Sequence, residues 1–312
     1  MKKQLVILFA IILVIASCDK DDDFDPNYAD DGQTSIDNDQ NSNDNQAEEG
    51  SLALYQVNGD EITKIKDYSV ASNLQSFQED YAKHLKMWDF VTRLLPLEDR
   101  KKITEFEVFH GNGELLGYVT PVDPSDLSKW RFALAIDAAD QIEDINFKDL
   151  FTYVAIHEYG HVVTLNNNQI DVSDNNCGSN YFTGEGCSRS NSYINRLYNL
   201  GWADIYQELD DENPYVLYDK YKDRFVSDYA ATNPGEDVAE VFSFFVTTEK
   251  APTGNSIADQ KIRLLYEYPE LVELRSRIRT NGNVPVQRLT NWRDNLMYSK
   301  IRICSRKACQ KH

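Results

Sequence analysis

The sequence predicts an α+β fold, with a small mixed β-sheet in the first half of one domain and a mostly helical second half. Between residues 105 and 137, short strand-like segments are separated by a Gly-containing turn. From about residue 147 onward, most segments carry apolar residues at helical spacing. A mixed sheet followed by helices is typical of the α+β class. The span 51–312 contains 262 residues without a repeat or a second linker, enough for one large core.

The N-terminus has the pattern of an export signal. Two lysines precede Leu5–Ala16, an apolar run of 12 residues that is too short to span a membrane but suits the core of a signal peptide. Small residues then precede Cys18, an arrangement that resembles a bacterial lipobox. The resemblance implies that residues 1–17 are a lipoprotein signal peptide and that Cys18 is lipidated. A plain secretory signal is the alternative.

The segment 18–50 is expected to be a disordered acidic tether. Residues 19–50 hold 12 acidic side chains and one lysine, and almost no apolar residues with which to offset the entropy of ordering. Lys20 followed by two aspartates resembles the signal that sends some outer-membrane lipoproteins to the cell surface, although an ordinary solvated linker is equally consistent. The net charge of −19 argues against nucleic acid as a partner and against binding to anionic lipid by charge.

The first half of the domain contains one expected helical region and three expected strands. Helical spacing extends over about 70–103, and His84 is expected on the surface of that helix because it has no partner at ligand spacing. Two strands, within 105–113 and 114–122, are joined by a Gly-containing turn. A third strand, 130–137, alternates apolar and polar residues.

The second half begins with a helix over about 147–166, followed by a loop at 167–192 that is rich in Asn, Ser, Gly and Asp. Further helices are expected at 192–209, 215–225, 235–249, 256–279 and 288–302. Four cysteines remain besides Cys18, and an even number in an exported protein suggests two disulfides with three open connectivities. Their closeness in sequence favours the pairs Cys177–Cys187 and Cys304–Cys309.

The helix at 147–166 contains the stretch AIHEYGHVV. His157 and His161 are four residues apart, so they project from the same helix face and can bind one zinc ion. Glu158 is rotated by about 100° from His157, so it can reach a water on that metal and act as a general base. Gly160 weakens the helix but allows another element to pack closely. The structural alternative is a surface helix with two histidines.

A third ligand is expected in the segment SDYAATNPGEDVAEVFSFF, residues 227–245. Asn233 can cap a helix there, and Glu236 and Glu240 share one face of it. Carboxylates on a mostly apolar helix need a partner if they are buried, and zinc with its histidines is such a partner. The alternative for Glu236 is a capping-box residue that reaches back to the amide of Asn233.

HEYGH together with DYAATNPGEDVAEVF resembles the gluzincins of the anthrax lethal factor type, over about thirty residues in two blocks. The resemblance implies a zincin-like catalytic domain with one zinc ion held by His157, His161 and Glu236. It also implies that Tyr229 donates its hydroxyl to the oxyanion and that Glu240 supports the ligands. With the lipobox, the chain further resembles zinc metallohydrolase lipoproteins found with TonB-dependent outer-membrane import systems.

The predicted function is therefore that of a zinc metallopeptidase anchored as a lipoprotein in the outer membrane and exposed at the cell surface, acting on peptide or protein substrates. The strand at 130–137 resembles the zincin edge strand, to which an extended peptide adds as a further strand. One alternative is a non-catalytic binding component of an import complex, which would not need the base Glu158. Another is a zinc hydrolase of non-peptide or glycosylated substrates.

Overall fold

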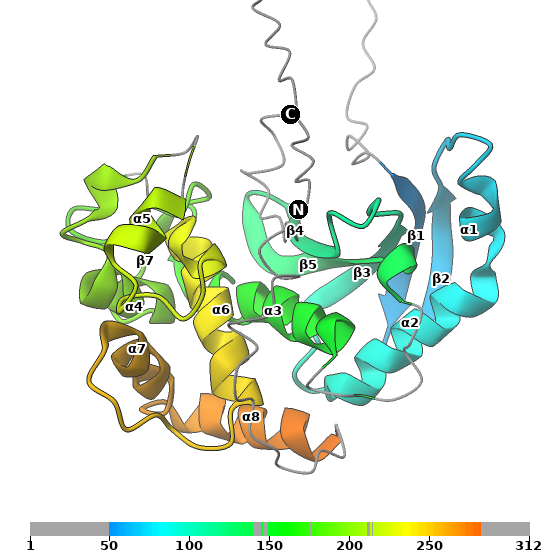
Figure 1. Ribbon diagram of the computed structural model, residues 1–312. Coiled ribbons are helices and arrows are strands. Elements are labelled where there is room, and N and C mark those ends of the chain that lie inside the picture. The colour runs from blue at the N-terminus through cyan, green and yellow to red at the C-terminus, as the bar shows by residue number, and fades with distance from the viewer. Residues whose placement is uncertain are drawn as a thin grey trace, which may run out of the picture. The chain divides into compact units, whose positions relative to one another are not determined.

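A five-stranded mixed β-sheet begins the described part of the protein, as Figure 1 shows in the computed structural model. The structure describes residues 50–139, 145, 149–174, 176–210, 213 and 215–281. The strands of this sheet are β1 (Ser51–Asn58), β2 (Glu61–Asp67), β3 (Ile103–Phe109), β4 (Gly117–Asp123) and β5 (Asp126–Ala135). Their order is β2-β1-β3-β5-β4, with β3 and β5 parallel and all other neighbours antiparallel.

Helices make up most of the described chain after the sheet, so the predicted α+β class is confirmed. The α-helices in the described ranges are α1 (Gln75–Glu79), α2 (Tyr81–Leu94), α3 (Leu150–Thr164), α4 (Tyr193–Gly201), α5 (Tyr215–Lys220), α6 (Pro234–Thr247), α7 (Ile257–Leu265) and α8 (Pro269–Asn281). Shorter elements are the strands β6 (Ile170–Asp171) and β7 (Cys187–Ser188) and the 3₁₀ turns η1 (Ile136–Ala138), η2 (Tyr206–Glu208) and η3 (Tyr229–Ala231). The single helix expected at 256–279 is two helices, because Pro269 fits a first turn but cannot continue a preceding helix.

The strand order corrects the expectation that 130–137 is an edge strand. Strand β5 pairs with β3 on one side and with β4 on the other, so β4 is the edge. Consequently β3 and β4, although joined by a Gly-containing turn, are not neighbours in the sheet. No strand is expected from the sequence before residue 105, yet β1 and β2 form a tight hairpin whose two turn residues are Gly59 and Asp60, and a glycine at the first of these positions favours such turns.

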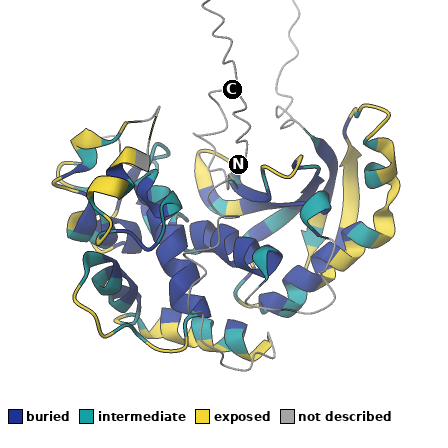
Figure 2. Cartoon of the chain, viewed as in Figure 1, coloured by how far each residue is buried: buried dark blue, intermediate teal, exposed yellow. Residues whose placement is uncertain are grey.

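Helix α3 lies between the sheet and α6 (Figure 1), and it contacts β4 and β5 on one side and α6 on the other. Figure 2 shows both α3 and α6 buried along nearly their whole length. The two helices approach closely at Gly160, where a Cβ atom would lie 3.2 Å from Ala239 Cα and 3.1 Å from Phe242 Cδ1. The expected use of Gly160, close packing against another element, is confirmed.

Strand β4 approaches the other side of α3 just as closely. A Cβ atom on Gly117 would lie 2.8 Å from Val154 Cγ1 and 3.0 Å from Glu158 Cγ. No side chain therefore fits between this strand and the helix, and the backbone of the edge strand rests against the HEYGH segment.

His84 is buried, so its expected position on a helix surface is wrong. Its ring lies on the inner face of α2, with Nδ1 2.6 Å from the hydroxyl of Tyr55 on β1 and Nε2 2.9 Å from the carbonyl of Phe77. Both ring nitrogens have partners, which offsets the cost of burying them. Burial lowers the pKa of His84 below 6.5.

Several expectations lie outside the described residues. These are the signal peptide 1–17, lipidation of Cys18, the tether up to Gly50, the helix 288–302 and the disulfide Cys304–Cys309. Within the described ranges, none of the helices is both long enough and apolar enough to span a membrane.

Candidate metal centre

Helix α3 presents the two histidines of the HEYGH segment to α6. Asp149 caps its N-terminus by accepting a hydrogen bond from the amide of Phe151 at 2.9 Å. Because the helix is covered on both sides, its interior residues are buried regardless of polarity, including His157, Glu158 and His161. Three buried titratable side chains within five residues require hydrogen-bond partners, opposite charges or a metal.

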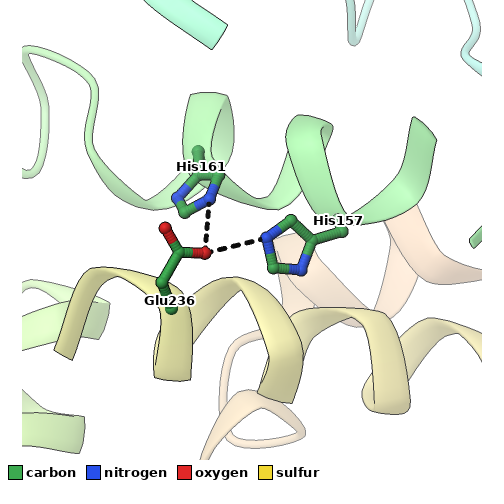
Figure 3. A group of neighbouring side chains, drawn as sticks. All are labelled: His157, His161 and Glu236. Carbon is green, nitrogen blue, oxygen red and sulfur yellow. Dashed lines mark hydrogen bonds and ion pairs between the residues drawn. The ribbon is translucent and has the colours of Figure 1, made fainter. Parts of the chain in front are cut away.

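Helix α6 supplies the partner. Asn233 caps it as predicted, accepting a hydrogen bond from the Glu236 amide at 3.0 Å. The side chain of Glu236 faces the histidines, with Oε2 3.1 Å from His157 Nε2 and 3.3 Å from His161 Nε2 (Figure 3). The carboxylate is therefore directed across the helix interface at the two imidazoles.

The three side chains fit a zinc ion. One ligand atom from each of His157, His161 and Glu236 lies within 4.8 Å of the other two. Two ligands of a tetrahedral zinc ion with bonds of 2.0 to 2.1 Å are about 3.3 Å apart, close to the two separations across the helices. Both ring nitrogens of His161 and Oε1 of Glu236 are buried without a hydrogen-bond partner among the described residues. Two imidazoles and one carboxylate are also a donor set that catalytic zinc prefers.

Glu240, one helical turn after Glu236, contacts the opposite side of the His157 ring. Its Oε1 lies 2.9 Å from His157 Nδ1, so Nε2 is the nitrogen that faces Glu236. Burial opposes charging of the imidazole, but the hydrogen bonds to Glu236 and Glu240 outweigh it and raise the pKa of His157 from 6.5 to about 10. Two carboxylates therefore face this imidazole, and their negative charge favours a cation at the centre.

Glu158 lies in the same buried region, and its carboxylate forms no hydrogen bond with the described residues. Neither carboxylate oxygen has a hydrogen-bond partner within the described ranges, and the residue has no exposed surface. Burial raises the pKa of Glu158 well above 4.5, an effect that His157 opposes and Glu236 reinforces. A raised pKa makes the Glu158 carboxylate a stronger base than an exposed one, a property that suits a general base.

Tyr229 begins the turn η3, and its ring centroid lies 5.8 Å from that of His157. Burial raises the pKa of its phenol well above 10, and the neighbouring carboxylates of Glu236 and Glu158 add to the shift. The hydroxyl therefore stays protonated at neutral pH and remains a hydrogen-bond donor.

Two polar residues of this centre are not among the sequence predictions. The Tyr153 hydroxyl donates to Glu240 Oε1 at 2.7 Å, and the Ser227 hydroxyl donates to Glu240 Oε2 at 2.5 Å. Tyr153 lies four residues before His157 on the same helix face, so its spacing carried a signal. Ser227 lies in a turn whose position depends on tertiary packing.

The predicted disulfide between Cys177 and Cys187 is present, with Cα atoms 5.1 Å apart. It closes the loop that follows α3, next to the short pairing of β6 with β7. Neither cysteine belongs to the group of metal-ligand candidates.

No protein-family model matches this chain, and no curated protein matches it. Among solved structures, the chain is similar to a "putative zinc-binding metallo-peptidase" from Bacteroides caccae, with 19% identity over 72% of this chain and 86% of that chain and a TM-score of 0.33. Neither value is high enough to support an inference about the fold or the site, so both rest on the geometry described above.

Proposed function

We propose that this protein is a zinc-dependent metallopeptidase. The observation that carries the proposal is the convergence of His157, His161 and Glu236 on one buried point, with Glu158 beside them and unpaired among the described residues. Zinc held by these three ligands would polarise a substrate carbonyl and make an attacking water more acidic. A centre that only bound metal would not need the additional buried carboxyl of Glu158 beside its three ligands.

Three residues of the chain would each take one part of the reaction: transfer of the proton, stabilisation of the oxyanion, or orientation of a ligand. Glu158 accepts the proton of the attacking water as its oxygen bonds to the carbonyl carbon, and returns that proton to the leaving amine as the C–N bond breaks. Tyr229 donates its hydroxyl to the carbonyl oxygen as that oxygen gains negative charge. Glu240 keeps the ring of His157 in the orientation that directs Nε2 at the centre.

The edge strand β4 supports a peptide as the substrate. The amide of Ala135 donates to the carbonyl of Leu116 at 2.9 Å, so alternate residues beyond it face β5. Gly117 and Val119 then direct their amides and carbonyls to the open edge, beside Glu158. An extended peptide can pair there as a sixth strand. Pro121 is the next residue that faces this edge. It has no N–H group, so the row of backbone hydrogen-bond donors ends there.

The N-terminal sequence supports the proposed location. We infer that the protein is an outer-membrane lipoprotein, attached through Cys18 and exposed at the cell surface, with a TonB-dependent import system as a candidate partner. These inferences rest on the lipobox-like pattern and on the acidic segment after it.

Two measurements test the proposed activity. The purified protein should contain about one zinc ion per chain, and it should cleave members of a diverse peptide library. Chelation should abolish cleavage, and added zinc should restore it. Glu158→Gln should retain zinc while turnover falls by a factor of about 10² or more. A zinc-loaded parent that cleaves no peptide would contradict the assignment and favour a binding component or a hydrolase of another substrate class.

A further inference from the structure

Glu240 is fixed at both of its carboxylate oxygens. On one side, Oε1 receives the Tyr153 hydroxyl at 2.7 Å and lies 2.9 Å from His157 Nδ1. On the other side, Oε2 receives the Ser227 hydroxyl at 2.5 Å. Glu240 is almost fully buried, so water cannot easily replace either donor. The plane of this carboxylate, and with it the ring of His157, is therefore set by Tyr153 and Ser227.

Ser227 makes a second contact, with the turn η3. Its Oγ accepts a hydrogen bond from the Ala230 amide at 3.0 Å. That amide belongs to η3, the turn that begins with Tyr229. A hydroxyl can donate once and accept at the same time, so one oxygen atom joins the Glu240 carboxylate to the tyrosine turn.

We propose that Ser227 is a positioning residue that couples the orientation of the metal ligand His157 to the placement of Tyr229. The part that concerns Tyr229 rests on the proposed function. Tyr153 is the second positioning residue, through its hydrogen bond to Glu240. Loss of the Ser227 hydroxyl should loosen both the imidazole and the tyrosine turn, whereas loss of the Tyr153 hydroxyl should loosen the imidazole.

The first test measures zinc affinity, which does not depend on activity. Zinc is titrated against a chromophoric chelator in the full-length parent, Ser227→Ala, Ser227→Thr and Tyr153→Phe. Ser227→Ala and Tyr153→Phe should each bind zinc about 10-fold more weakly, the lower end of the range for residues that support a ligand. Ser227→Thr keeps the hydroxyl and should bind within about threefold of the parent.

Two control variants remove buried hydroxyls elsewhere on α3 and α6. Ser243 donates only to the Ala239 carbonyl within α6, and Tyr159 on α3 donates to the Asp99 carbonyl. Ser243→Ala and Tyr159→Phe should leave zinc affinity unchanged. If Ser227→Ala binds zinc like the parent, or if Ser243→Ala weakens binding as much, the positioning role is refuted.

The second test separates the effect of Ser227 on His157 from its effect on Tyr229. At saturating zinc, Ser227→Ala should lower kcat about 10-fold or more because Tyr229 is displaced, and this loss should exceed the kcat loss of Tyr153→Phe. Equal kcat losses in both variants would refute the coupling to Tyr229. A parent without peptidase activity would refute the proposed function instead, and the zinc affinities would still decide whether Ser227 positions His157.

Discussion

Replacing Gly160 by alanine tests whether the close approach of α3 and α6 builds the metal centre. The new Cβ would lie 3.1 Å from Phe242 Cδ1, 3.2 Å from Ala239 Cα and 3.3 Å from Ala239 O. Carbon atoms pack best at about 3.5 to 4.0 Å, so α6 must move away by roughly 0.3 to 0.5 Å. A change in the Phe242 rotamer relieves only one of these contacts, because the other two involve backbone.

Two opposing terms set the stability of this variant. Alanine is favoured over glycine in a helix by about 1 kcal/mol, and overpacking a core costs about 1 to 3 kcal/mol. The zinc-free protein should therefore lose about 0 to 2 kcal/mol of unfolding free energy. Zinc binding should suffer more, because Glu236 lies three residues before Ala239 and moves with it. Ligand distances are tolerated only within about 0.2 Å, so we expect zinc affinity to fall at least about 10-fold.

The assay combines thermal unfolding of the zinc-free protein with zinc titration against a competing chelator. Gly160→Ser, with one more atom at the same contact, should bind zinc still more weakly than Gly160→Ala. Adding Phe242→Leu should recover only part of the loss, since the backbone contacts remain. If Gly160→Ala is more stable than the parent and binds zinc equally well, the close approach does not position Glu236 and the reasoning fails.

The other predictions concern the ligands, a buried ion pair and a buried histidine. Glu236→Ala should lose zinc affinity more strongly than Glu240→Ala, whose loss should be about 10- to 100-fold; the reverse ranking in a zinc titration would show that the ligand is one helical turn away. Lys261 and Asp237 form a fully buried ion pair at 2.5 Å. Lys261→Met alone should cost about 3 to 5 kcal/mol of unfolding free energy, whereas adding Asp237→Asn should recover part of it; an equal cost in denaturant unfolding would contradict this. For His84, burial lowers the folded-state pKa below 6.5, so the unfolded chain takes up the proton first. Stability should therefore decrease as pH falls below 6.5, by up to about 1.4 kcal/mol per pH unit, and the His84→Gln variant should lack this component; identical slopes in the two proteins would refute it.

The sequence predicted best those features that local chemistry controls. The helix expected over 147–166 is α3, Leu150–Thr164, and the one expected over 235–249 is α6, Pro234–Thr247. Each has a capping residue and a continuous helical pattern, and both signals lie within a few residues of the element itself. The Cys177–Cys187 bond was also predictable, because a short loop keeps the two cysteines close.

Features that depend on distant segments were missed. The order of the strands cannot be read along the chain, because β5 inserts between β3 and β4 only when the sheet assembles. His84 looked like a surface residue because its own helix gives no sign of Tyr55, which reaches it from β1. The hairpin turn at Gly59–Asp60 is different, since its signal was local and available in the sequence.

By itself, the sequence determined that His157 and His161 share a helix face and that Glu236 and Glu240 share another, because side-chain direction along a helix follows from residue spacing. Only the tertiary structure decided that these two faces meet, and which carboxylate meets which nitrogen. That pairing depends on the close approach of α3 to α6 at Gly160, which has no side chain. His157 lies 79 residues from Glu236 and 83 from Glu240, and contacts over such separations come from packing the whole core, so no local pattern could specify them.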